Sequence, residues 1–216
     1  MYGLIVVGVI LFWLFAVIGL GILITYRDFK PYRECRKDLD YEKLEKCVME
    51  KLSRPKINPE TINYHKILLA SYALCFDLEK YEALVHSITP PKTKNYIFAY
   101  DTLDFNFLLS LQEFAQKKDQ LKSQYTNKKI YLNKIKEFYF KWLIYYTGDL
   151  EDKTKTIDEV CPYHTKSELT NAVNLFIQIH YYYHHKKEEE FIKLKQLFLE
   201  KYSKLEVMKN KIEELE

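Results

Sequence analysis

The stretch from His180 to Phe191, HYYYHHKKEEEF, combines metal-binding and titratable side chains at close spacing. If one helix continued through it, His180, His184 and Glu188 would lie at positions i, i+4 and i+8 on a single face. Two imidazoles and a carboxylate in that arrangement can bind zinc or iron(II). The stretch therefore offers one chemical alternative, a helical metalloprotein or metalloenzyme.

A second interpretation makes the same stretch a corner between two helices. Histidines and lysines are favoured at a helix C-terminus, where free carbonyl groups make the end negative, and glutamates at an N-terminus, where free amides make it positive. HYYYHH would then end one helix, KK would form the joint, and EEEF would begin the next helix. We favour this interpretation, and we predict no metal and no cofactor.

Cys161 and His164 are a second pair that could do chemistry, because a thiol beside an imidazole can act as a nucleophile. Catalysis needs hydrogen-bonding distance between them, and a loop cysteine before a helix-ending proline is the simpler interpretation. The sequence contains no glycine-rich phosphate loop, no Gly-x-Ser-x-Gly elbow and no His-Glu-x-x-His motif. We therefore predict that the protein is not an enzyme.

Residues 1–26 have the pattern of a membrane anchor. Residues 4–24 carry no charged side chain, and about 20 apolar residues in a helix span the roughly 30 Å hydrocarbon core of a bilayer. Three residues precede the apolar run, and its exit, ITYRDFKPYR, has no small-residue cleavage site, which argues against a signal peptide. The pattern predicts a single uncleaved transmembrane helix.

Residues 27–37 form a basic segment directly after the apolar run. They hold five basic and two acidic residues, whereas the rest of the chain holds 28 of each sign, so the formal net charge of +3 lies in this segment. The positive-inside rule then predicts a single-pass protein of the cell membrane with its C-terminal domain in the cytoplasm. A neutral body argues against nucleic acid as a partner. The basic residues are Arg27, Lys30, Arg33, Arg36 and Lys37.

The remaining residues, 38–216, are expected to form an all-α domain. Only 5 glycines and 6 prolines occur in 216 residues, too few for the frequent turns of a β protein. Asp38 or Asp40, Asn58 before Pro59, and Ser167 are expected N-caps, because their side chains can accept from free first-turn amides. Polar joints near residues 77, 117–118, 149 and 187 are expected to separate the helices.

These joints recur at intervals of roughly 30 to 40 residues, which is typical of stacked helix pairs. Residues 77–79 and 149–151 repeat the triplet Asp-Leu-Glu, 72 residues apart. Ala70, Ala73 and Ala83 could allow close packing within the first pair. On these features, residues 58–203 resemble tetratricopeptide-like repeats. The resemblance implies an α-solenoid-like array of about four helix-turn-helix pairs after the transmembrane helix.

An array of this kind presents a concave face formed by the first helix of each pair. We therefore predict a membrane-anchored scaffold or adaptor that binds a protein or peptide partner, with no small-molecule substrate. The alternatives are a membrane-tethered metalloprotein that uses the histidine and glutamate residues above, and a purely structural subunit of a membrane complex. The candidate groove residues are Tyr64, Tyr139, Asn171, Asn174 and Gln178.

Overall fold

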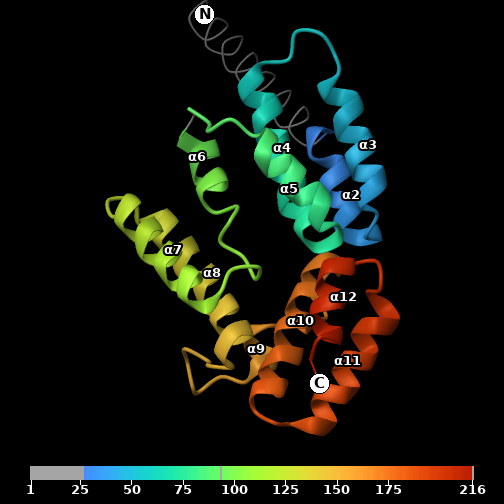
Figure 1. Cartoon of the computed structure of the whole chain (residues 1–216), viewed down its shortest axis with the longest axis vertical. Helices are drawn as coiled ribbons and strands as arrows, with labels where there is room; N and C mark the ends of the chain where they lie inside the picture. The colour runs from blue at the N-terminus through green and yellow to red at the C-terminus, as the bar shows by residue number, and fades with distance from the viewer. Residues whose placement is uncertain (1–26, 93, 216) are drawn as a thin grey trace, which may run out of the picture.

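The computed structural model describes residues 27–92 and 94–215 (Figure 1). Within these ranges the regular structure is helical, and no strand occurs, which confirms the prediction of an all-α chain for the described part. The helices are α2 (Lys30–Asp38), α3 (Tyr41–Leu52), α4 (Pro59–Phe76), α5 (Leu78–Ser87), α6 (Lys94–Asp101), α7 (Leu111–Gln124), α8 (Lys129–Thr147), α9 (Ile157–Val160), α10 (Glu168–His184), α11 (Glu188–Lys201) and α12 (Glu206–Glu213).

The helices gather into three groups around α10. Helices α2 to α5 form an N-terminal group, and α10 to α12 form a C-terminal group below it in the view of Figure 1. Helices α6 to α8 form an arm at the left of the view (Figure 1). Helix α10 contacts α2 and α8 as well as α11 and α12, and α12 contacts α4. Helix α10 therefore holds all three groups together.

Helices α4 and α10 occupy central positions, and each of them buries long runs of its side chains. Leu69, Ala70 and Ala73 on α4 and Leu175 and Phe176 on α10 are fully buried. A helix that is apolar all round is stable only when neighbours cover every face. The surrounding α3, α5, α6 and α12 supply that cover for α4.

Local capping signals begin several helices where the sequence predicts. Asp40 accepts from the Lys43 amide at 2.9 Å, Asn58 caps α4, and Ser167 caps α10. Asp77 ends α4 and caps α5, so the predicted joint near residue 77 is confirmed. Each such cap typically contributes about 1 kcal/mol to stability.

The predicted joint at residues 117–118 is wrong. Lys117 and Lys118 lie in the middle of α7, which begins at a capping box between Ser110 and Glu113. Both lysines lie within one turn of the buried Phe114 and Leu121, and their amines reach Asp104 and the Tyr139 ring. Lysine is a good helix former with a long apolar stem, so two adjacent lysines do not interrupt a helix.

The chain between α6 and α7, residues 102–110, instead forms the long joint of the arm. Phe105 stacks on Phe114 with ring centroids 4.5 Å apart, and Phe107 packs 5.2 Å from Trp142. The buried Asn106 side chain donates to the Leu103 carbonyl and accepts from the Leu108 amide. These bonds satisfy the polar backbone of a loop that would otherwise be costly to bury.

The prediction of a linear α-solenoid-like array is also corrected by the helix contacts. In a solenoid each repeat contacts only its neighbours, whereas here α10 contacts α2 and α12 contacts α4. Helix α2 buries Tyr32 and Cys35 in the common core. The predicted domain boundary after residue 37 therefore falls inside the packed body.

The transmembrane part of the predicted fold needs a correction as well. Among the residues that the structure describes, no helix is both long enough and apolar enough to cross a membrane. The stretch on which that prediction rested, residues 1–26, lies outside the described residues. The fold described here is accordingly an all-helical body without a membrane-spanning helix in it.

The corner at residues 180–191 confirms the second interpretation of that stretch. Helix α10 ends at His184, α11 begins at Glu188, and the joint contains Lys186 with a φ of 53°. The corner packs against the end of α8, where the His185 ring lies 2.9 Å from the Gly148 carbonyl oxygen. The end of α8 and the corner between α10 and α11 therefore hold each other in place.

Gly148 and Lys186 provide a matched test of this corner. Gly148 has a φ of +74°, and a Cβ there would lie 2.8 Å from His184 Cβ. We expect Gly148→Ala to lower the free energy of unfolding by about 1–2 kcal/mol, because L side chains are strained in this conformation. Lys186→Gly should raise it by up to about 1 kcal/mol for the same reason. Urea denaturation measures the free energy of unfolding of both variants. Changes of the same sign would contradict a left-handed backbone at both positions.

Candidate functional site

A groove of about 410 Å³ lies where the N-terminal group, the arm and α10 meet. Its walls come from α4, the end of α6 with the joint that follows, α8 and α10. Most of the lining side chains are apolar, and Phe138, with half of its surface exposed, stands at the solvent side. The apolar lining residues are Ile67, Leu68, Leu74, Cys75, Ala99, Leu103, Phe105, Phe107, Phe138, Trp142, Leu169, Val173 and Ile177.

The charged residues that line this groove are both basic. Arg36 of α2 is exposed and Lys141 of α8 is half-buried. Neither forms an ion pair with a carboxylate of the described chain, whereas other lysines, such as Lys51 and Lys80, do. The groove is therefore apolar inside and positively charged at its border.

Hydrogen bonds fix the position of Arg36. Its Nε donates to the Tyr72 hydroxyl at 2.9 Å, and that hydroxyl donates to the Tyr32 carbonyl oxygen at 3.3 Å. Tyr72 and Tyr32 are both buried. The guanidinium is thus anchored through one donor, and no hydrogen bond to the described chain occupies its terminal nitrogens.

Three of the predicted groove residues lie in one row on α10 and have a different neighbour. Asn171, Asn174 and Gln178 are buried, and their side chains hydrogen-bond the segment 158–165 around α9. The bonds join Asn171 to Thr165, Asn174 to the Pro162 carbonyl at 2.6 Å, and Gln178 to Asp158 and the Cys161 carbonyl at 2.9 Å each. Only Asn174 of these three also lines the central groove.

The two predicted tyrosines lie apart from that row and do not line the groove. Tyr64 of α4 stacks on Tyr96 of α6 with centroids 4.2 Å apart. Tyr139 of α8 stacks on Phe114 of α7, and the Lys118 amine lies 4.5 Å from its ring centroid. Both therefore join neighbouring helices. The structure does not bring the five predicted residues together into one surface.

The predicted basic segment is distributed around α2. Arg27, Lys30, Arg36 and Lys37 are exposed, and Arg33 is half-buried. Lys30 lies 3.6 Å from Glu34 on the same helix. Only Arg36 of this set lines the central groove.

The alternative metal set is not assembled. Because α10 ends at His184, Glu188 does not continue its helical face. His180 is buried against Tyr145 and Phe176, and the His184 ring lies 2.9 Å from the Tyr145 carbonyl oxygen. No group of three potential metal ligands occurs anywhere in the described ranges.

His65 is the centre of a buried polar network among α2, α3 and α4. Lys51 lies 3.2 Å from His65 Nε2 and 3.0 Å from Asp28. A lysine only donates, so Nε2 accepts and the proton is on Nδ1, which donates to the Tyr32 hydroxyl at 2.9 Å. Burial, followed by the Lys51 charge, lowers the pKa of His65 to about 4. The ring is therefore neutral at pH 7 and holds three helices together.

The buried cysteines do not form a nucleophilic site. Cys161 is fully buried, and burial raises the pKa of its thiol to about 11. Burial raises the pKa values of Cys35 and Cys75 to about 12. A thiol with a raised pKa is a poor nucleophile at neutral pH, because the thiolate is the reactive form.

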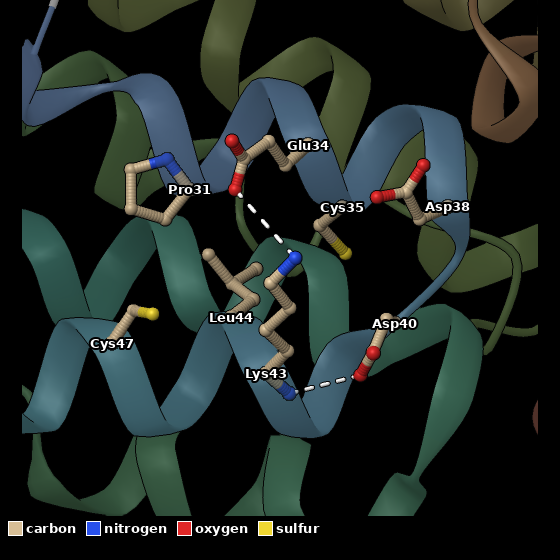
Figure 2. Close-up of a pocket in the computed structure, with 8 residues that line it drawn as sticks. All are labelled: Pro31, Glu34, Cys35, Asp38, Asp40, Lys43, Leu44 and Cys47. Atoms are coloured by element: carbon tan, nitrogen blue, oxygen red, sulfur yellow. Dashed lines mark hydrogen bonds and ion pairs between the residues drawn. The ribbon is translucent and has the colours of Figure 1, made fainter.

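A small cleft between α2 and α3 carries the acidic residues of that hairpin (Figure 2). Glu34, Asp38 and Asp40 border it, and Lys43 pairs with Glu34 at 3.9 Å. Its volume of about 10 Å³ is the space of roughly one water molecule. The central groove is therefore the better candidate for a binding site.

The part of the chain that the structure describes is all-helical, and its central groove is an apolar concavity with a positively charged border. No protein-family model matches the sequence, and neither a curated protein nor a solved structure matches the chain.

Most residues of the groove were not predicted from the sequence. Phe105 and Phe107 could have been recognised, since two aromatic residues at i and i+2 in DFNF indicate a buried, non-helical segment. Lys141 carried no such signal, because a single lysine in an aromatic helix resembles any solvated side chain.

Proposed function

We propose that the chain is a non-catalytic helical scaffold that binds a protein or peptide partner, and that the central groove receives an apolar segment of this partner. The observation that carries the proposal is the groove of about 410 Å³ with its apolar lining. Grooves of about 300–1,000 Å³ with apolar walls and a few polar groups are typical binding sites. This volume suits a few large apolar side chains rather than a whole domain.

The distribution of exposed apolar side chains favours a groove binder over a purely structural subunit. A structural subunit is expected to have one large continuous apolar patch. The large exposed apolar residues of the described chain are instead spread over six helices. They are Met49 on α3, Leu78 on α5, Leu111 on α7, Ile130 and Phe138 on α8, Tyr183 on α10 and Ile192 on α11.

Site-specific photocrosslinking tests the proposal. A benzophenone amino acid replaces Phe138 in the full-length chain, in cells that express it naturally. The control position is Ile130, which lies on the same helix, is 66% exposed and does not line the groove. We expect one discrete crosslinked partner from position 138 and none from position 130.

Two serine variants complete the experiment. Ser71 and Ser87 are both exposed, and both hydroxyls donate to the carbonyl three residues earlier, but only Ser71 lines the groove. Ser71→Trp should fill the groove and abolish the crosslink from position 138, whereas Ser87→Trp should leave it unchanged. Equal crosslinking from both α8 positions, or insensitivity to Ser71→Trp, would contradict the proposed function.

A further inference from the structure

We propose that the partner segment carries an aspartate or glutamate side chain beside its apolar anchors, and that Arg36 and Lys141 recognise this carboxylate. The inference rests on the proposed function and adds the chemical class of the peptide. It concerns side-chain carboxylates within a peptide, and it does not require a free C-terminus.

Charge complementarity is the first argument. Among the described residues, Arg36 and Lys141 are the charged members of the groove lining, and no carboxylate lines the groove with them. Elsewhere in the described chain basic side chains often pair with acidic ones, as in the pairs of Lys51 with Asp28 and Lys80 with Glu45. Two unpaired cations beside apolar walls produce a local positive potential, and a concave low-dielectric surface strengthens it.

The positioning of Arg36 is the second argument. An exposed arginine normally samples many rotamers, which costs entropy when it is ordered on binding. Here the buried Tyr72 hydroxyl holds Nε at 2.9 Å and is itself bonded to the Tyr32 carbonyl. The terminal nitrogens of the guanidinium are thus presented in a set orientation, and such a fork matches a carboxylate in a bidentate geometry.

The composition of the walls is the third argument. Trp142 lies beside Lys141 on α8, and Val173 and Ile177 face the groove from α10. A ligand that is only anionic would leave these apolar side chains exposed, and one that is only apolar would leave both cations without a counter-charge. A peptide with adjacent apolar and acidic residues satisfies both parts of the lining.

A display library of random twelve-residue peptides, presented internally so that no C-terminus is free, tests the inference on the full-length chain. We expect the wild-type chain to enrich peptides in which aliphatic or aromatic residues lie beside Asp or Glu. The Arg36→Gln, Lys141→Gln double variant should enrich apolar peptides without the acidic bias. The Arg54→Gln, Lys129→Gln double variant, with two basic residues that do not line the groove, should select like the wild type.

The outcomes separate the two proposals. Enrichment of apolar peptides without an acidic bias, combined with loss of enrichment in Ser71→Trp, would overturn this inference and leave the proposed function in place. No enrichment at all, or enrichment that Ser71→Trp does not affect, would overturn both. An acidic bias that persists in the Arg36→Gln, Lys141→Gln variant would overturn the assignment of these two residues.

A synthetic copy of the most enriched peptide, with blocked termini, then measures the contribution of the carboxylate. Replacing its Asp or Glu by the corresponding amide should raise Kd about tenfold, as expected for a charge-assisted pair. The same replacement should have little effect on Kd for the Arg36→Gln, Lys141→Gln variant. Tyr72→Phe, which keeps both charges but removes the anchor of Arg36, should raise Kd by about threefold, since an unanchored side chain loses entropy on binding. An unchanged Kd after the amide replacement would overturn the inference.

Discussion

Replacing Phe176 by alanine is expected to lower the free energy of unfolding by about 3–5 kcal/mol, the range for large-to-small changes of a buried phenylalanine. Phe176 is fully buried on α10. Its ring lies 5.4 Å from Phe107 and 5.3 Å from Tyr145, both in the arm, and 6.3 Å from Phe198 on α11. The neighbouring rings belong to the joint of the arm, to α8 and to α11, so the cavity cannot close without shifting these elements.

The matched control is Phe138→Ala. Phe138 is also a helical phenylalanine, but half of its surface is exposed, so its removal should cost less than about 1 kcal/mol. Urea denaturation followed by circular dichroism measures both variants. A Phe176→Ala variant no less stable than Phe138→Ala would show that α10 does not pack the arm against the C-terminal group as described.

The second large effect is a loss of stability in acid that depends on His180. His180 is 5% exposed, its Nε2 has no hydrogen-bond partner in the described chain, and burial lowers its pKa to about 3, with smaller contributions from His184 and Lys211. In the unfolded chain the same side chain titrates near 6.5. Between these two values the unfolded state binds a proton that the folded state does not, so the free energy of unfolding falls as the pH falls.

Between pH 7.5 and pH 4.5 this histidine should account for a loss of about 2–3 kcal/mol, from about 1.36 kcal/mol for each unit between pH 6.5 and pH 4.5. His180→Leu should remove that part of the pH dependence, because leucine has no proton to gain. Its stability at pH 7.5 should change little or rise, since an unpartnered buried nitrogen is also removed.

Denaturant unfolding of wild type and His180→Leu at both pH values measures the difference. The control is His86→Leu, because His86 is exposed on α5 and should leave the pH dependence close to that of the wild type. His65 and the carboxylates contribute to acid sensitivity in every variant, so their contributions cancel when His180→Leu is compared with the wild type. If His180→Leu lost as much stability as the wild type between pH 7.5 and 4.5, the buried, neutral state of His180 would be ruled out.

Local chemistry allowed the sequence to predict the helical class and several helix boundaries. The N-caps Asp40, Asn58 and Ser167, and the corner at residues 184–188, depend only on residues within one or two turns of each other. Such signals are readable without knowledge of the fold. The predicted joint at Lys117 and Lys118 was wrong because two adjacent charged residues resemble a polar joint in sequence, although lysine is a good helix former.

The groove and the arrangement of the helices were decided by tertiary packing. Arg36 and Lys141 line one concavity although they lie on α2 and α8, and both helices border it because both pack on α10. Asn171 and Gln178 resembled binding residues, but the fold uses them to hold the segment 158–165. A polar side chain on a helix is equally suited to a ligand or to a loop. Long-range apolar packing brings either a ligand site or a loop within reach of that side chain, and so it determines which of the two the side chain contacts.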